Sequence, residues 1–478
     1  MSDITKREII SALEKIVGKE FVETDEAAVK LYSREASGLE GVAVAVVFPE
    51  NTSQISDIVK FAYKNDVKIY PQGSATALAG SALPEREKGI IISFDRMNKI
   101  IDYSIVDSYI VAQSGVKIIE INEVLSKEGY MFPVDPASMK SATVGGLINA
   151  GGGGLRGALY GTMREWIMEA EIVLPDENGS IIRVGCRTTK CRQGYDLLRL
   201  FVGSEGTLGI VPEATLKISP LPENIVTAVG FFDELEHAME AVVGIKKDKI
   251  APYAMEFLDA KTVEIGKQSL QLDWNVKGNM LIVSVSGPPE AAERYLNLLE
   301  KNMKNAGATT IMKAASSAEA EELRLLDLRR ACYPSAIQLA AQSMDPEISK
   351  PLVLIEDIAV PPTKLPETVK RLRKLEEKYR LPLVIFGHVG DGNLHPTTWI
   401  DATNEEAKKK VWEMFDEIMK IALDLGGTIS AEHGIGLLKK KGLEMEFGRK
   451  KSLKAIELMR KIKQIFDPKN ILNPGKVI

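Results

Sequence analysis

The sequence predicts an α+β protein built from two or three domains. Its 478 residues exceed the ~250–300 residues at which a single hydrophobic core stops growing. Short apolar runs typical of strands alternate along the chain with charged segments of helical periodicity. Large glycine-rich stretches are confined to the part before Pro220 and return only at Gly387, so we expect two different kinds of domain.

The bulk composition indicates a soluble globular protein and excludes several partners. Hydrophobic residues make up 45% and charged residues 27%, as in ordinary soluble domains. A formal net charge of −5 provides no basic field for nucleic acid and no polybasic patch for a membrane. No apolar run approaches the ~20 residues that span a bilayer, and the polar N-terminus lacks the apolar core of a signal peptide. We therefore expect a cytoplasmic protein without a transmembrane segment.

The three cysteines, Cys186, Cys191 and Cys332, are scattered, which suggests a reducing compartment. They are too few for an iron–sulfur cluster, which takes four ligands. The chain also lacks a Cys-x-x-Cys-His haem site. The chain therefore offers no iron–sulfur or c-type haem route for electrons.

The first glycine-rich stretch follows a predicted strand at residues 67–70, after a helix ending near Asn65. It is the loop Pro71–Ser81, which contains small residues almost throughout. Small side chains leave backbone amides accessible, and successive exposed amides form a nest that suits phosphate. Taken alone, a flexible surface loop explains this segment equally well.

Two further glycine-rich stretches follow at residues 143–154 and 203–211. Gly152, Gly154 and Gly157 match G-x-G-x-x-G, but we reject a Rossmann site because no strand precedes the match and no clear helix follows it. The glycine density instead indicates that backbone lies close to a flat or phosphorylated group. Between the two stretches, the segments 170–174 and 180–184 predict a hairpin.

The second domain, beginning near Ile225, contains the residues with the clearest metal-binding pattern. The chain has four histidines, and two of them, His388 and His395, flank a glycine-rich turn after a predicted buried strand at 383–386. Both can point into one cavity, and Glu432 would add a carboxylate to form a two-histidine, one-carboxylate metal site. Core histidines satisfied by hydrogen bonds are the weaker alternative. Two basic residues of this domain, Arg329 and Lys350, are most simply interpreted as solvated surface charges.

The chain resembles, over nearly its whole length, the FAD-linked oxidases of the vanillyl-alcohol-oxidase superfamily. The resemblance is to the branch that contains D-lactate dehydrogenase, the glycolate oxidase large subunit and D-2-hydroxyglutarate dehydrogenase. The motifs that carry it, in chain order, are the Pro71–Ser81 loop, Asp135-Pro136-x-Ser138, Thr143-Val144-Gly145-Gly146, Gly203-Ser204-Glu205-Gly206-Thr207-Leu208-Gly209, His388-x-Gly-Asp-Gly-Asn-x-His395, Glu432-His433-Gly434 and Leu472-Asn473-Pro474-Gly475-Lys476.

The resemblance implies a two-part FAD-binding domain at residues 1–220, divided near residue 100. A substrate or cap domain with an antiparallel sheet would follow at 221–425, and residues 426–478 would return to the flavin. Because the first loop holds no histidine and the flavin motifs hold no cysteine, FAD should be non-covalent. The implied FAD-binding residues are Pro71, Gly73, Ser74, Thr76, Leu78, Asp135, Ser138, Thr143, Val144, Gly145, Gly146, Asn149, Gly152, Gly206, Ile210, Val211 and Asn473.

Pattern and resemblance together predict the oxidation of a 2-hydroxy acid. The substrate carboxylate would pair with Arg329 and Lys350. A divalent metal held by His388, His395 and Glu432, zinc before manganese or iron, would polarise the hydroxyl. His433 would act as the general base, and the flavin would accept hydride. An electron-transfer flavoprotein or an iron–sulfur subunit would then receive the electrons.

Other functions are compatible with parts of the sequence. A non-haem iron oxygenase would use the histidine pair directly, but it leaves the three glycine-rich stretches unexplained. A non-catalytic electron-relay subunit would not need the base or the metal ligands. Within the enzyme family, D-2-hydroxyglutarate is the alternative substrate. Tyr333 and Thr397 stand where that branch tends to have threonine and asparagine, so we expect a small monocarboxylate such as D-lactate or glycolate.

Overall fold

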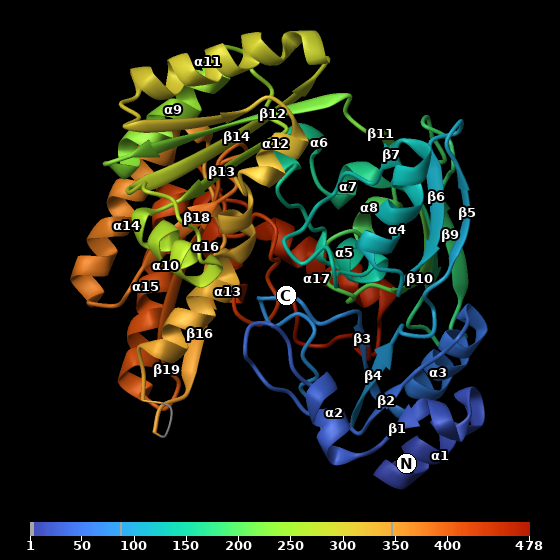
Figure 1. Cartoon of the computed structure of the whole chain (residues 1–478). Coiled ribbons are helices and arrows are strands. Elements are labelled where there is room, and N and C mark those ends of the chain that lie inside the picture. The colour runs from blue at the N-terminus through green and yellow to red at the C-terminus, as the bar shows by residue number, and fades with distance from the viewer. Residues whose placement is uncertain (1–3, 87, 346–347) are drawn as a thin grey trace. The chain divides into compact units, whose positions relative to one another are not determined.

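The structure, a computed structural model, describes residues 4–86, 88–345 and 348–478. The chain forms two compact units (Figure 1), each of which mixes helices and strands, as the predicted α+β class requires. The first unit contains Met1–Gly153, Thr162–Leu221 and Glu432–Ile478, and the second contains Gly154–Gly161 and Pro222–Ala431.

The first unit begins with a four-stranded sheet in the order β1-β2-β4-β3. Strands β2, β4 and β3 are parallel, and β1 is antiparallel to β2. Ile90, Ile91 and Ile92 of β4 are all fully buried, because helices α1 and α3 cover one face of the sheet and α2 lies on the other. The elements are α1 (Lys6–Val17), β1 (Val22–Glu23), α2 (Glu26–Tyr32), β2 (Ala45–Val47), α3 (Thr52–Asn65), β3 (Lys68–Gln72) and β4 (Gly89–Ser93).

The rest of the first unit is an antiparallel five-stranded sheet with short helices. Its order is β5-β6-β10-β8-β9, and the predicted hairpin at 170–184 is the β8–β9 pair. The strands are β5 (Ile100–Ser104), β6 (Tyr109–Gln113), β8 (Ile167–Val173), β9 (Ile181–Gly185) and β10 (Ile210–Lys217), with the small pair β7 (Tyr130–Met131) and β11 (Ser219–Pro220). The helices are α4 (Ile118–Leu125), α5 (Val144–Ala150), α7 (Met163–Trp166) and α8 (Leu198–Phe201).

The C-terminal segment belongs to the first unit. It forms helices α16 (Lys440–Arg449) and α17 (Leu453–Phe466) and then returns to the first sheet. Leu472 forms a bridge with Ile69 of β3, and Ile471 and Leu472 are fully buried in the same core as β3 and β4. Residues 473–478 therefore start from a fixed point beside the first glycine-rich loop.

The second unit is built on one eight-stranded antiparallel sheet. Its order is β15-β12-β14-β13-β18-β19-β16, with the short β17 paired to β19. The strands are β12 (Asn224–Phe232), β13 (Ala254–Leu258), β14 (Asn279–Gly287), β15 (Thr310–Ala314), β16 (Pro351–Ile355), β17 (Ile358–Ala359), β18 (Val384–Gly387) and β19 (Asn393–Asp401).

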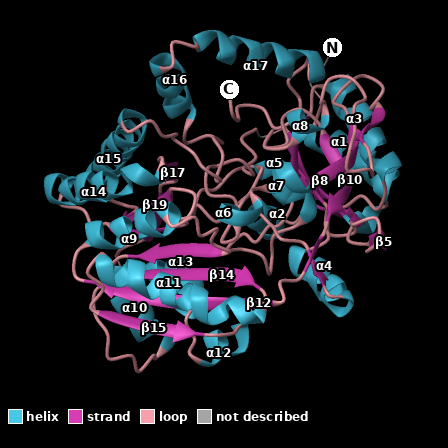
Figure 2. Ribbon diagram, turned by 90° about the horizontal axis from the view of Figure 1, so that it is seen from above, coloured by secondary structure: helices cyan, strands magenta, loops and turns pink. Residues whose placement is uncertain are grey.

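Helices cover both faces of this sheet. Apolar residues of α9, α11, α14 and α15 form the core on one face, and those of α10, α12 and α13 form the core on the other. Figure 2 shows α14 and α15 side by side. The helices are α6 (Gly157–Tyr160), α9 (Leu235–Lys247), α10 (Ala260–Leu270), α11 (Ala292–Asn305), α12 (Ser317–Glu322), α13 (Asp327–Gln342), α14 (Leu365–Tyr379) and α15 (Glu405–Asp424).

Two of the three cysteines are not free thiols. Cys186 and Cys191, five residues apart after β9, form a disulfide, so the cysteines do not support the reducing compartment that their pattern suggested. The sequence did not predict this pair, because the bond depends on how the loop between the two cysteines folds back. Cys332 is buried on α13, and burial raises the pKa of its thiol to about 12. Every described helix is too short or too polar to span a bilayer.

Candidate active site

A hairpin of β18 and β19 in the second unit brings two predicted metal ligands together. His388 follows β18 and His395 is the third residue of β19, and the backbone N–H of Asn393 donates to the carbonyl of His388 at 3.1 Å. Gly392 has φ +90°, and a Cβ there would lie 1.9 Å from the carbonyl oxygen of Val360. The imidazole centroids are 5.4 Å apart, and one nitrogen of each ring lies within 4.8 Å of the other.

A buried carboxylate contacts the Nδ1 atom of His388. Glu256 of β13 has no exposed surface, and one of its oxygens lies 2.9 Å from Nδ1 of His388. Its other oxygen accepts a hydrogen bond from Nε of Arg329 at 2.5 Å. A histidine bound through Nδ1 to a carboxylate presents Nε2 to a metal in many metal sites. The sequence interpretation missed Glu256, although a single carboxylate in the apolar strand Ala254–Leu258 was a usable signal.

A second buried carboxylate lies beside His395. Asp357 has no exposed surface, and its Oδ1 lies 3.7 Å from Nδ1 of His395 and accepts from the side chain of Asn393 at 2.8 Å. Its Oδ2 accepts from the Ser430 hydroxyl at 3.1 Å and from the Ala431 backbone N–H at 2.8 Å. Asp357 therefore joins the histidine hairpin to the end of the second unit.

Glu432 and His433 follow Ala431 directly as the first residues of the C-terminal segment. Both side chains are half-buried, with 4.0 Å between Oε1 of Glu432 and Nε2 of His433. A Cβ on Gly153 would lie 3.2 Å from the Glu432 carboxylate. The predicted ligand and the predicted base are thus neighbours in the chain, one peptide bond beyond the Asp357-bound segment.

The two predicted basic residues have different surroundings. Arg329 on α13 is 5% exposed, and its guanidinium lies 5.4 Å from the centroid of the Phe386 ring, so the interpretation as a solvated charge is wrong. Nη2 of Arg329 lies 3.3 Å from Nε2 of His388. Lys350 is exposed and its backbone N–H donates to Asp401 at 3.0 Å. Asp401 is at the far end of β19 from His395, roughly 20 Å along an extended strand. The structure therefore does not bring Lys350 to Arg329.

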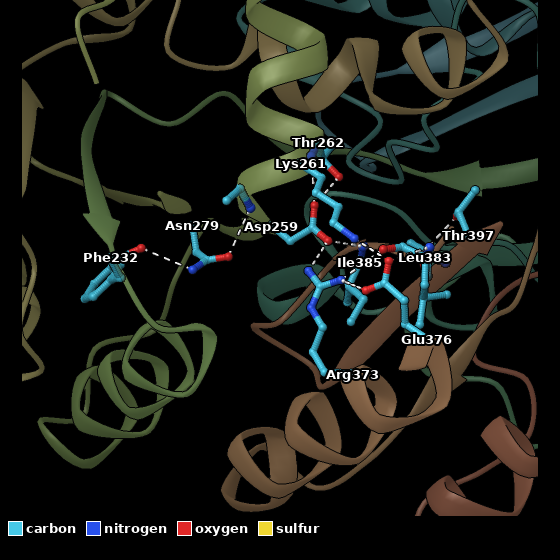
Figure 3. Close-up of polar contacts among 12 residues, drawn as sticks. Phe232, Asp259, Lys261, Thr262, Asn279, Arg373, Glu376, Leu383, Ile385 and Thr397 are labelled. Carbon is cyan, nitrogen blue, oxygen red and sulfur yellow. Dashed lines mark hydrogen bonds and ion pairs between the residues drawn. The ribbon is translucent and has the colours of Figure 1, made fainter. Parts of the chain in front are cut away.

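Strand β18 is anchored by the fully buried Asp259 (Figure 3). Its Oδ2 accepts from Nη2 of Arg373 at 2.6 Å and from the backbone N–H of Ile385 at 2.8 Å. Its Oδ1 accepts from the backbone N–H of Thr262 at 2.8 Å and thereby caps α10. The hairpin that carries the histidines is thus held by α10 and α14, which restricts its movement.

In the first unit, the three glycine-rich stretches contact one another. A Cβ on Gly73 would lie 2.4 Å from Oγ1 of Thr143. Gly206 has φ +65°, and a Cβ there would lie 2.9 Å from Cγ of Pro71 and 3.4 Å from Nδ2 of Asn149. These positions need glycine because neighbouring segments approach so closely.

Asn473 closes this cluster from the C-terminal side. Its Nδ2 donates to the carbonyls of Ser81 at 2.8 Å and Glu205 at 2.6 Å. In the described part of the chain, Oδ1 of Asn473, Oδ1 of Asn149 and Oγ of Ser204 are buried without a hydrogen-bond partner. Unpaired buried polar atoms cost about 1–3 kcal/mol each. A polar cofactor bound between these loops would satisfy them, so the residues present fit a flavin nucleotide.

The other predicted cofactor residues fall into two groups. Gly145 and Gly152 are explained by packing within the protein, since a Cβ would lie 2.6 Å from Ser114 Oγ at Gly145 and 2.6 Å from Leu147 at Gly152. The remainder lie along the loops and at element ends: Ser74 exposed; Thr76, Leu78, Asp135 and Ser138 partly buried; Val144 and Gly146 in the first turn of α5; and Ile210 and Val211 buried at the start of β10.

These features fit a flavin-dependent oxidoreductase, and the family models identify the chain as one. The chain belongs to the FAD-linked oxidases: residues 221–477 match the family model described as FAD linked oxidases, C-terminal domain, and residues 43–185 match the FAD binding domain. The predicted membership of the FAD-linked oxidases and the predicted α+β fold are confirmed.

Relatives and solved structures resemble the chain over nearly its full length. It is 36% identical to glycolate oxidase subunit GlcD of Bacillus subtilis strain 168, over 99% of this chain and 97% of that protein. It is 34% identical to a D-lactate dehydrogenase of Archaeoglobus fulgidus, over 91% of each chain. Two structures share the fold: p-cresol methylhydroxylase (TM-score 0.78, 16% identity, 98% of this chain and 96% of that one) and alkyldihydroxyacetonephosphate synthase (TM-score 0.74, 18% identity, 98% and 85%).

Proposed function

We propose that the protein is a FAD-dependent dehydrogenase that oxidises a small D-2-hydroxy acid, D-lactate or glycolate, to the 2-oxo acid. The observation that carries the proposal is the buried pair His388 and His395 with Arg329 beside it, because a guanidinium next to metal-binding imidazoles suits a 2-hydroxycarboxylate. Names of relatives, D-lactate dehydrogenase and glycolate oxidase subunit, support the same substrate class.

In this proposal the first unit holds non-covalent FAD. Gly73, Ser74 and Thr76 bind the pyrophosphate through backbone and hydroxyl groups, Thr143 and Asn149 line the flavin, and Ile210 and Val211 lie nearer the adenine. The unpaired oxygens of Asn149 and Asn473 support this assignment. When bound, FAD supplies the acceptor for the hydride that leaves C2 of the substrate.

His388, His395 and Glu432 would hold a divalent cation, zinc in preference to manganese or iron. Two imidazoles, each with a buried carboxylate near Nδ1, fit such an ion. When bound, the cation supplies Lewis-acid polarisation that lowers the pKa of the substrate hydroxyl.

The side chains of this chain bind the substrate and accept its proton. Glu256 accepts from Nε of Arg329 and thereby orients the guanidinium, whose planar shape suits pairing with the substrate carboxylate. A ring nitrogen of His433 accepts the proton of the substrate hydroxyl, so that one proton and one hydride leave the substrate. The burial of His388 and His395 keeps water away from the reacting centre.

A separate carrier, an electron-transfer flavoprotein or an iron–sulfur subunit, would take the electrons. This part of the proposal rests on the cysteine content, because three cysteines, two of them joined in a disulfide, cannot hold a cluster. Rapid turnover of the purified chain with oxygen as sole acceptor would contradict it.

The test is anaerobic bleaching of the flavin absorbance by a panel of D-lactate, L-lactate, glycolate and D-2-hydroxyglutarate. We expect D-lactate or glycolate to reduce the flavin fastest. Faster reduction by D-2-hydroxyglutarate would replace the proposed substrate, and faster reduction by L-lactate would overturn the stereochemistry. No bleaching by any of them would favour a relay subunit. The variant His433→Asn should retain FAD and lose the reduction by ~10²–10⁴-fold.

A further inference from the structure

Glu205 lies in the third glycine-rich turn of the first unit and binds the C-terminal segment. Its side chain is buried and its φ is +53°, an uncommon conformation for a residue with a Cβ. Its Oε1 accepts from the backbone N–H of Ile435 at 2.6 Å, and its Oε2 accepts from that of Gly436 at 2.8 Å. A Cβ on Gly434 would lie 2.6 Å from the same carboxylate. One carboxylate thus contacts a whole turn.

That turn, Gly434–Gly436, directly follows Glu432 and His433. Gly434 has φ +82° and Gly436 has φ +49°, so two of its three residues are conformationally permissive and depend on their surroundings to stay in place. Beyond the turn, the backbone N–H of Leu437 donates to the carbonyl of Ala79 at 2.9 Å. Glu205 therefore supplies side-chain contacts at the point nearest to the predicted ligand and base.

The carboxylate lies among other buried charges. Glu35, which accepts from the backbone N–H groups of Gly80 at 2.6 Å and Ala82 at 3.1 Å, raises the pKa of Glu205. Lys476, 3.0 Å from Glu85 and 2% exposed, lowers it. Burial has the largest effect and raises the pKa of Glu205 to about 7, although the two backbone hydrogen bonds lower this pKa.

We propose that Glu205 is a positioning residue whose ionised carboxylate holds the Gly434–Gly436 turn and thereby orients Glu432 and His433. The inference rests on the proposed roles of those two residues. An ionised carboxylate accepts both N–H groups, whereas the protonated form carries a hydrogen on one oxygen and loses one of the two bonds. The turn should therefore be held above neutral pH and loosen as the pH falls through about 7.

The effect on stability has the opposite sign. The folded protein keeps the Glu205 proton up to about pH 7, while the unfolded chain releases it near 4.5. The contribution of this group to stability is therefore complete below about 4.5 and is lost as the pH rises through about 7. A structural carboxylate of lowered pKa would show the reverse, so the two measurements together identify the group.

The experiment compares the FAD-loaded protein with Glu205→Gln. Glutamine can accept one N–H but turns its own NH₂ toward the other donor. In hydrogen exchange of peptides that cover 433–438, corrected for intrinsic rates, the wild type should exchange roughly tenfold more slowly at pH 8 than at pH 6. The variant should exchange fast at both. The difference in thermal midpoint, variant minus wild type, should be more positive at pH 8 than at pH 5. Equal exchange in both proteins at both pH values would overturn the proposal.

Glu35→Gln and Lys476→Gln are controls in the same cluster, and they serve also if Glu205→Gln does not fold. Removing the negative charge of Glu35 should move the midpoint of the pH-dependent exchange to lower pH, and removing the positive charge of Lys476 should move it to higher pH. Shifts in the same direction, or none, would overturn the assignment to Glu205. None of these measurements needs a substrate. If the exchange responds as expected but no hydroxy acid bleaches the flavin, the positioning role stands and the proposed substrate falls.

Discussion

The histidine hairpin of the second unit and the glycine-rich loops of the first unit place their functional groups in different ways. In the hairpin the functional groups are side chains, and a buried carboxylate from elsewhere in the chain lies beside each histidine: Glu256 of β13 beside His388, and Asp357, between β16 and β17, beside His395. In the loops much of the functional surface is backbone, and glycines such as Gly206 are needed because segments approach too closely for a Cβ. The difference predicts that substitutions in the hairpin will abolish chemistry while FAD stays bound, and that substitutions at the loops will release FAD.

The largest effect is expected from His388→Ala, which tests whether the two regions can be separated. Loss of one of two buried imidazoles should remove the bound metal and reduce flavin reduction to background, while the flavin spectrum stays unchanged. Metal analysis and anaerobic stopped-flow spectroscopy measure both. His237→Ala, on the exposed face of α9, is the control and should behave as wild type. Full activity of a metal-free preparation would remove the metal from the proposal.

Glu256→Gln should have the next largest effect, because it acts on His388 and Arg329 together. Metal affinity should fall by ~10–100-fold, and stability by about 3–5 kcal/mol because the charge of Arg329 stays buried without its partner. Metal titration and chemical denaturation are the measurements. Glu367→Gln breaks an exposed Glu–Arg pair, with Arg371 at 2.7 Å, and should change neither quantity measurably. Equal effects of the two substitutions would refute the special role of Glu256.

Asn473→Ala examines the other side of the comparison. It removes hydrogen bonds to the carbonyls of Ser81 and Glu205, so the affinity for FAD should fall by roughly tenfold while metal content is retained. Fluorescence titration of the flavin-free protein measures the affinity. Asn470→Ala is a matched control, since Asn470 is exposed and has a similar left-handed φ of +49°. If both variants bind FAD equally well, Asn473 does not close the flavin site.

The smallest expected effect concerns substrate size. Tyr333 lies one helical turn after Arg329 on α13 and is half-buried against Ala336, Ala340 and Val353. Tyr333→Thr should enlarge the space beside Arg329 and raise the rate ratio of D-2-hydroxyglutarate to D-lactate by about tenfold. Flavin reduction by each acid gives the ratio. Tyr195→Thr, at a side chain 97% exposed, should leave it unchanged. An unchanged ratio in Tyr333→Thr would show that this side chain does not limit the pocket.

Local patterns were sufficient for several elements. The helix that ends near Asn65 and the hairpin of segments 170–174 and 180–184 occur as predicted, because amphipathic periodicity and turn residues act over a few positions. The two histidines also lie close together as predicted, since the glycines between them allow the tight turn that brings their rings together. Family motifs extended these local predictions to the FAD-linked fold.

The sequence by itself determined the class of the fold, the family and the residues that bear the proposed chemistry, since all of these depend on residue types and short spacings. Only the tertiary structure decided which of those residues meet. Strand order places Glu256 next to His388 and places Lys350 at the end of β19 that is far from His395. Loop closure joins Cys186 to Cys191. Segments far apart in the chain also bury Arg329, which the sequence alone suggested to be a surface charge. Burial of the same kind raises the pKa of Glu205. Burial and long-range pairing are properties of the packed chain, so no local pattern encodes them.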